Sequence, residues 1–117
     1  MKRDLELLKK ILMKVEELPV GRCLSPPLGI EDYDEEIVFE HVRLLQEANF
    51  IEAIVVLNPR TYEVSRLLND GHDFVANAKN PAIWKKTIDF LSKKGGDVSL
   101  ALVKGLLVKI ASNHLGL

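Results

Sequence analysis

The sequence predicts a mostly helical α+β fold that contains one small β-hairpin. Two observations predict it: several stretches carry apolar residues at helical spacing, and among them lie two β-rich runs separated by a proline turn. The chain has 117 residues, of which 47% are hydrophobic and 28% charged, a balance typical of a folded protein and too apolar for a disordered one. We therefore expect a single domain over residues 1–117 with its own core.

The first predicted helix covers about residues 5–18 and is amphipathic, because leucines recur along one face while lysines and glutamates take the other. Pro19 and Gly21 end it, since proline cannot donate the helical hydrogen bond. Residues 19–32 are predicted to form a loop. Within that loop, Leu28–Ile30 follows a proline pair and is predicted to be a short edge strand.

A second helix is predicted to begin after Asp34, a residue that suits the N-cap position. It ends before Asn49, which stands where a left-handed residue is wanted. Its outward face is expected to be acidic, with Phe39 as an exposed apolar residue on it. His41 falls on the inward face, where a hydrogen-bonded structural role is favoured over metal binding or catalysis.

The hairpin is predicted from two runs on either side of a turn at residues 58–61. The first run, residues 50–57, is nearly all apolar and is expected to be an inner strand. The return strand is expected over residues 62–67. Arg60 lies at the tip of this hairpin, and Arg66 lies on the return strand.

Three further helices are predicted after the hairpin. One begins near Asn69, and the next begins after Asn80, which suits an N-cap with proline behind it. The last helix, about residues 100–113, is apolar on most faces and must be covered on most sides. We therefore predict a homodimer through this helix. The predicted interface residues are Leu100, Val103, Leu106, Leu107 and Ile110.

A helix followed by a hairpin and another helix is the order in which a winged-helix domain places its recognition helix and wing. This order predicts a winged-helix core over about residues 4–79 with a C-terminal helical extension over about residues 80–117. The segment from Glu40 to Ile51 is similar to the helix-to-wing junction of winged-helix repressors, with Asn49 where glycine is usual. Leu68 stands where such repressors usually have a capping threonine.

Residues 1–8, the segment from Glu40 to Ile51, and the segment from Gly71 to Phe74 together resemble a family of small bacterial and prophage proteins. That family is catalogued only as a domain of unknown function. The resemblance runs the full length of the chain, and it implies the fold without implying an established activity.

Enzyme function is the class that the sequence supports least. No nucleophile–base pair, metal cluster or phosphate-binding glycine loop occurs at a recognisable spacing. Five carboxylates within residues 31–36 match no calcium loop, and Cys23 has no positioned base. We therefore predict no catalytic residue, metal ligand, cofactor or small-molecule substrate.

The sequence also predicts a cytoplasmic location. Its single cysteine excludes an internal disulfide and indicates a reducing compartment. The first residues include no apolar block of the kind that a signal peptide has, and no apolar run is long enough to span a membrane. We accordingly expect no membrane partner.

The net charge of −1 conceals a gradient, because residues 1–58 carry a net −5 and residues 59–117 a net +4. This gradient supports a polar partner at the C-terminal half or head-to-tail self-association. Two functions stay open: a DNA-binding, transcriptional-regulator-like module with weak affinity, and a protein-interaction or adaptor module that keeps the winged helix without binding DNA. The acidic second helix opposes the first of these, since phosphate contacts by basic residues supply most DNA-binding free energy. The residues predicted to contact nucleic acid are Arg43, Arg60, Arg66, Lys85, Lys86, Lys93 and Lys94.

Overall fold

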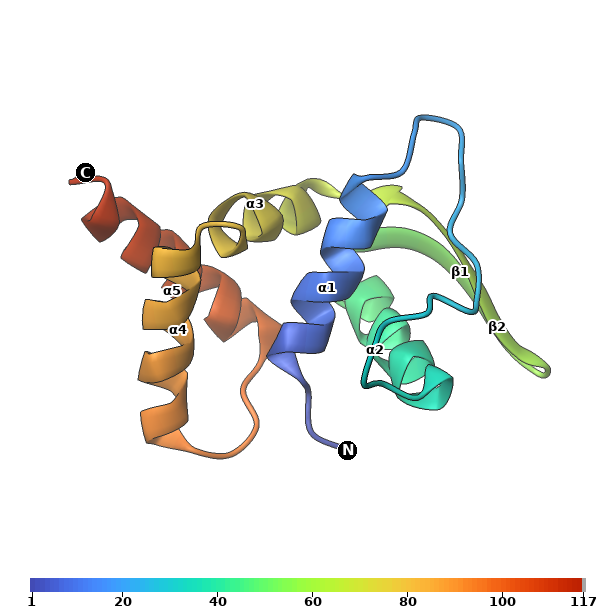
Figure 1. Cartoon of the computed structure of the whole chain (residues 1–117), viewed down its shortest axis with the longest axis horizontal. Coiled ribbons are helices and arrows are strands. Elements are labelled where there is room, and N and C mark those ends of the chain that lie inside the picture. Colours follow the sequence, from blue (N-terminus) through green and yellow to red (C-terminus); the bar gives the residue numbers. More distant parts are fainter. Residues whose placement is uncertain (117) are drawn as a thin grey trace. The chain divides into compact units, whose positions relative to one another are not determined.

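The computed structural model describes residues 1–116, and these form five helices and one two-stranded antiparallel hairpin (Figure 1). The mostly helical α+β class predicted from the sequence is confirmed. In chain order the elements are α1 (Leu5–Glu16), α2 (Glu35–Glu47), β1 (Ile51–Leu57), β2 (Arg60–Leu67), α3 (Asn69–Ala78), α4 (Pro81–Lys94) and α5 (Leu100–His114).

The chain divides into two compact units. We call residues 4–72 the hairpin unit, and residues 1–3 together with the chain from Asp73 onward the C-terminal unit. The boundary lies between His72 and Asp73, inside α3, whereas the sequence placed the end of the core at about residue 79.

Helix α1 forms because a cap and an apolar stripe agree. The Asp4 carboxylate accepts a hydrogen bond from the Leu7 N–H at 3.0 Å, which satisfies one of the free donors at the helix start. The apolar stripe is fully or almost fully buried, and its members are Leu7, Leu8, Ile11, Leu12 and Val15. The tyrosine hydroxyl of Tyr33 donates to the same Asp4 side chain at 3.0 Å, which ties the loop before α2 to the start of α1.

Helix α2 begins where predicted, but its first acids act differently from the prediction. Asp34 occupies the N-cap position without a side-chain capping bond. The next residue, Glu35, instead accepts from the backbone N–H groups of Leu28 at 3.2 Å and Gly29 at 3.3 Å. The Glu35 carboxylate therefore connects the preceding loop to the start of the helix.

The buried face of α2 is rotated from the predicted one. Phe39, predicted to be exposed, is only 5% exposed, whereas Ile37, two residues earlier on the same helix, is 38% exposed. The cause is a contact with the hairpin, because the Phe39 ring packs against the Tyr62 ring of β2, with ring centroids 6.2 Å apart. The hairpin thus determines which side of α2 is covered.

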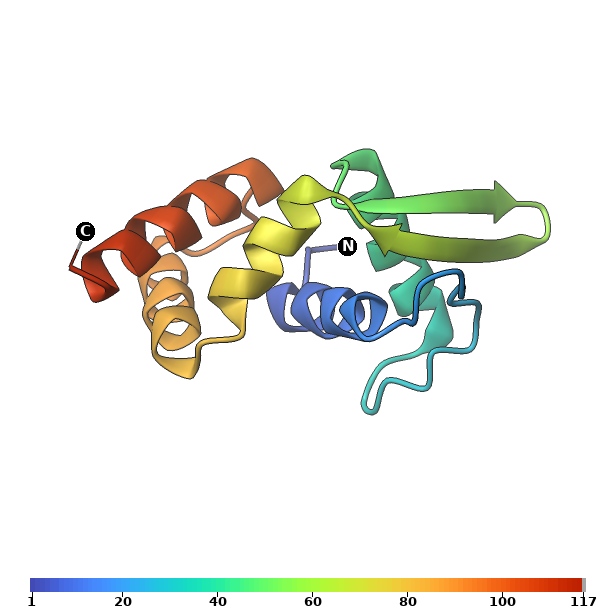
Figure 2. The ribbon, with the colours of Figure 1, turned by 90° about the horizontal axis from the view of Figure 1, so that it is seen from above.

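Strands β1 and β2 form the antiparallel hairpin seen in Figure 2. It turns through Asn58 and Pro59, with Leu57 opposite Arg60 and Ile51 opposite Leu67. The predicted edge strand at Leu28–Ile30 is wrong. An isolated antiparallel bridge forms instead between Leu24 and Val64, with backbone hydrogen bonds of 2.8 and 2.9 Å. Leu28 and Ile30 are buried as loop residues, each 7% exposed.

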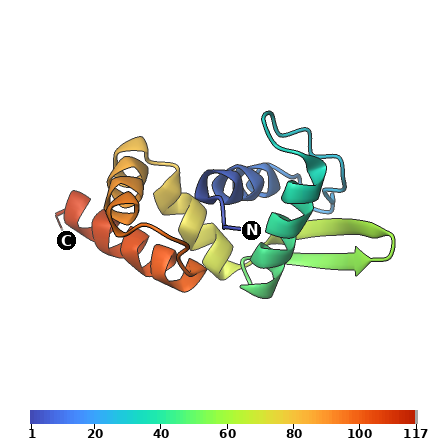
Figure 3. The same ribbon diagram turned by 90° about the horizontal axis from the view of Figure 1, so that it is seen from below.

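In the C-terminal unit, α4 and α5 pack against each other (Figure 3). The Asn80 side chain caps α4 by accepting from the N–H groups of Ala82 and Ile83, as the sequence predicted. Ser99 caps α5 by accepting from the Leu102 N–H at 3.1 Å. Trp84 of α4 meets the Phe74 ring of α3 edge-on, with centroids 6.0 Å apart.

Candidate functional site

All three arginines predicted to contact nucleic acid in the hairpin unit are paired with glutamates. Arg60 and Arg43 both contact the Glu40 carboxylate, the latter at 3.4 Å, and Arg66 contacts Glu52 at 3.3 Å. The Arg60 guanidinium also lies 4.9 Å from the centroid of the Phe39 ring. These pairs cancel the positive charge locally.

The hairpin unit as a whole is acidic. It holds seven lysines and arginines against fourteen aspartates and glutamates, a net charge of −7. On α2, Glu36 and Glu47 are exposed. The helix that a winged-helix protein would present to DNA therefore presents carboxylates in this chain.

The four lysines predicted to contact nucleic acid all lie on α4 and are exposed. Lys85 pairs with Asp89 at 3.0 Å, and the Lys94 ammonium lies 5.4 Å from the centroid of the Phe90 ring. The C-terminal unit has nine lysines and arginines against three aspartates, a net charge of +6. The seven predicted residues are thus divided between an acidic and a basic unit.

Strand β1 is the most exposed apolar element of the hairpin unit, contrary to its prediction as an inner strand. Ile54 is 69% exposed, Leu57 57% and Val56 39%. Ile54 and Val56 share one face of the strand because side chains alternate. Among the described residues only β2 pairs with β1, so the other edge of β1 has no strand beside it (Figure 2).

Carboxylates border this apolar face. Glu63 is the cross-strand partner of Ile54 and is exposed, and a hollow of about 290 Å³ is lined by Glu52, Ala53, Ile54, Glu63 and Ser65. The Ser65 hydroxyl donates to Glu52 at 2.8 Å. This hydrogen bond, with the nearby Arg66 charge, lowers the pKa of the Glu52 carboxyl.

A second, smaller pocket of about 140 Å³ lies between α2 and β2, and its lining residues are Pro26, Glu35, Glu36, Phe39, Arg60 and Tyr62. Its walls are mostly carbon. Tyr62 is 3% exposed, and its hydroxyl has no hydrogen-bond partner among the described residues. Burial and the Glu35 charge raise the pKa of Tyr62, so this hydroxyl stays protonated.

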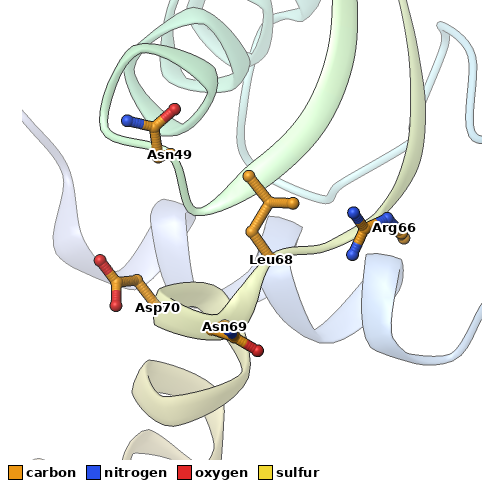
Figure 4. A pocket seen from close by; sticks show the side chains of 5 residues that line it. All are labelled: Asn49, Arg66, Leu68, Asn69 and Asp70. Carbon is orange, nitrogen blue, oxygen red and sulfur yellow. The ribbon is translucent and has the colours of Figure 1, made fainter.

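A third hollow marks the junction of α2, the hairpin and α3, and Figure 4 shows the side chains around it. It measures about 380 Å³ and is lined by Asn49, Arg66, Leu68, Asn69 and Asp70. The backbone explains its shape: Asn49 has a φ of 61°, and the Leu68 N–H donates to the Phe50 carbonyl at 2.9 Å. We assign this hollow a structural origin, since it forms where the chain turns from α2 into β1.

Three of the five α5 residues predicted for a dimer interface are buried within the chain. Leu100 is 6% exposed, and Val103 and Leu107 are 0% exposed, while Leu106 and Ile110 are half-buried. A buried side chain cannot contact a second copy. The homodimer stays a prediction, and on α5 the residues accessible to it are the half-buried Leu106 and Ile110 with the exposed Leu102 and Val108.

His41 has the structural role that the sequence favoured. It is fully buried; its Nε2 accepts from the Asp4 N–H at 2.9 Å, and its Nδ1 lies 2.8 Å from the Ile37 carbonyl. At Cys23, a hydrogen bond with Glu63 and that residue's charge raise the pKa of the thiol, which opposes its use as a nucleophile.

No group of three or more metal-ligating side chains occurs in residues 1–116. Within the same residues, no helix has the length and apolar character that crossing a membrane requires. Sequence reasoning missed the exposed β1 face and the pocket at Tyr62, because both depend on which strand face α2 covers.

Comparison with known proteins gives two matches. A family model described as "Hypothetical protein (DUF2513)" matches residues 2–97. A protein of Haemophilus influenzae, called "Uncharacterized protein", is 34% identical over 118 residues, which is 98% of this chain and 99% of the relative. No solved structure matches the chain significantly.

Proposed function

We propose that this chain, which belongs to the family described as "Hypothetical protein (DUF2513)", is a non-catalytic module that binds another protein through strand β1. The observation that carries the proposal is the exposed apolar face of a strand whose second edge has no partner strand within residues 1–116. Exposed apolar edge strands invite pairing with a further strand, so proteins without a partner usually keep them short, charged or covered. A strand with Ile54 and Val56 exposed has none of these protections at its centre.

The chemistry of the partner follows from the border of the strand. An extended segment added beside β1 would gain main-chain hydrogen bonds, and its alternate side chains would meet Ile54 and Val56. Glu52 and Glu63 lie on this same face, so a basic residue beside the apolar ones on the facing side of the segment would suit them. The partner segment is accordingly an extended one that carries both apolar and basic residues on one face.

We further infer that the hairpin unit is a winged-helix domain that has lost its DNA-binding surface. Helix α1, the Leu24 segment, α2, β1 and β2 follow one another in the order of such a domain, and Leu24 pairs with β2 as a third strand would. The loop at residues 25–34 takes the place of the helix that would precede the recognition helix. The acidic surface of α2 and the paired arginines support a module that no longer docks on phosphates.

The test is affinity isolation from cytoplasmic extracts of the native host with tagged wild type and an Ile54→Lys/Val56→Lys variant. The matched control is Val20→Lys, which changes a fully exposed loop valine in the same way. We expect at least one protein to be recovered with wild type and control and lost with the double variant. Identical recovery with all three would refute β1 as the binding element.

A second function, DNA binding, is favoured by one observation: the exposed lysine row on α4 in a unit of net charge +6. Its test is a salt titration of binding to non-specific duplex. Replacing Lys86 and Lys93 by alanine should reduce the slope of log affinity against log salt by about two. Arg60→Ala should leave it unchanged, because Arg60 already pairs with Glu40. No binding at low salt would remove this function.

A further inference from the structure

The pocket between α2 and β2 has the size of one aromatic ring. Its volume is about 140 Å³, and an apolar cavity of about 150 Å³ binds benzene. Drug-sized ligands occupy clefts of roughly 300 Å³ or more. The pocket therefore suits a single side chain of a protein partner better than a free cofactor.

The lining defines which side chain fits. Pro26 and the rings of Phe39 and Tyr62 supply apolar walls, and aromatic rings pack favourably against such rings. Glu35 and Glu36 are also among the lining residues and bring negative charge to the pocket, while the cation there, Arg60, is already paired with Glu40. The complementary element is an apolar ring carried on a positively charged surface.

Helix α4 carries such a ring. Phe90 is 47% exposed although it is a large apolar residue on a helix of the C-terminal unit. Lys86 lies one turn before it, and Lys93 and Lys94 lie one turn after it, so all three share its face. The Lys94 ammonium lies 5.4 Å from the centroid of the Phe90 ring.

We propose that Phe90 of one copy of this chain inserts into the α2–β2 pocket of a second copy, with the α4 lysines facing the Glu35 and Glu36 carboxylates. The overall charges agree, because the pocket belongs to the unit of net charge −7 and the ring to the unit of net charge +6. The contact joins two different surfaces, so it closes into a dimer when it forms reciprocally and extends into a chain when it does not. It is independent of β1 and of the partner proposed there.

The variants that test the contact change exposed residues, so they should fold. Phe90→Ala removes the ring, and Glu36→Lys places a positive charge at the pocket. Glu35 is not mutated, because its carboxylate accepts hydrogen bonds from the N–H groups of Leu28 and Gly29 and so holds the loop in place. Leu102→Ala on α5, where leucine is 46% exposed, is the matched control for loss of an exposed apolar residue.

The experiment measures the association constant of the full chain by sedimentation velocity and light scattering at low salt. Wild type and Leu102→Ala should associate equally, and each of the other two variants should associate about thirtyfold more weakly, as expected for loss of a central anchor residue. About 1 M salt should weaken the wild-type contact, since the Debye length falls to about 3 Å. Mixing Phe90→Ala with Glu36→Lys should restore a one-to-one complex, because one variant keeps the pocket and the other keeps the ring.

Three results would overturn the proposal. Wild type that stays monomeric to about millimolar concentration has no such contact. Association that survives Phe90→Ala, or that is lost with Leu102→Ala, belongs to another surface such as α5. A mixture of the two variants that stays monomeric excludes the pairing of this ring with this pocket.

Discussion

Replacing Gly71 by alanine should destabilise the protein, although the same change usually stabilises a helix. Alanine is favoured over glycine in helix interiors by about 1 kcal/mol. A Cβ atom at position 71 of α3 would, however, lie 2.1 Å from the Phe50 carbonyl oxygen and 3.3 Å from a methyl carbon of Leu67. The nearest of these atoms is backbone, so it cannot rotate away.

The magnitude follows from what has to move. Separating the Cβ from Phe50 O to an ordinary contact distance stretches the 2.9 Å hydrogen bond from the Leu68 N–H to that oxygen. Overpacking costs about 1–3 kcal/mol and a lost hydrogen bond about 1 kcal/mol. After the helix-propensity gain is subtracted, we expect a net loss of about 2 kcal/mol, or a Tm lower by about 5–10 °C.

Urea and thermal unfolding followed by far-UV circular dichroism measure this change. Gly105→Ala is the matched control, because position 105 also lies within a helix but a Cβ there meets no atom within 4 Å. The control should gain up to about 1 kcal/mol. A Gly71→Ala protein as stable as wild type would refute the close packing of Gly71 against the Phe50 carbonyl.

Three further predictions concern single side chains. Leu107→Asp should unfold the chain, because Leu107 is 0% exposed and a charge there would be buried. Val108→Asp changes a residue that is 47% exposed, so this variant should keep the circular dichroism spectrum of wild type. Equal effects of the two changes would contradict the burial pattern of α5. His41→Leu should cost about 2 kcal/mol in urea unfolding, because it leaves a buried backbone N–H without its acceptor. In wild type the Ser65 hydrogen bond lowers the pKa of Glu52, so Ser65→Ala should raise this pKa, as measured by NMR titration. The contribution of Glu52 to wild-type stability should be lost as the pH falls through its lowered pKa. An unchanged titration would mean that the serine hydroxyl does not hold the carboxylate.

The elements that local chemistry determines could be predicted from the sequence. Asn49 adopts the left-handed conformation expected after α2, with a φ of 61°, and Asn80 caps α4 as its position before proline indicates. The hairpin also follows from its two β-rich runs. In each case the deciding interaction lies within a few residues along the chain.

The features that depend on distant packing could not be predicted. Phe39 is buried because Tyr62 lies over its side of α2, and no periodicity within α2 reveals that. An apolar strand such as β1 is normally an inner one, and only its place beside a single partner strand leaves Ile54 exposed. The need for glycine at position 71 likewise comes from Phe50, which precedes the hairpin in the sequence whereas Gly71 follows it.

Hydrogen exchange of the backbone amides, measured with and without the protein recovered through β1, tests the central claim most directly. An added strand would hydrogen-bond the free edge of β1, so amides within residues 51–57 should exchange more slowly in the complex. The amides of α4 and α5 should be unchanged. Protection confined to α4 and α5, with β1 exchanging as in the free protein, would contradict the account.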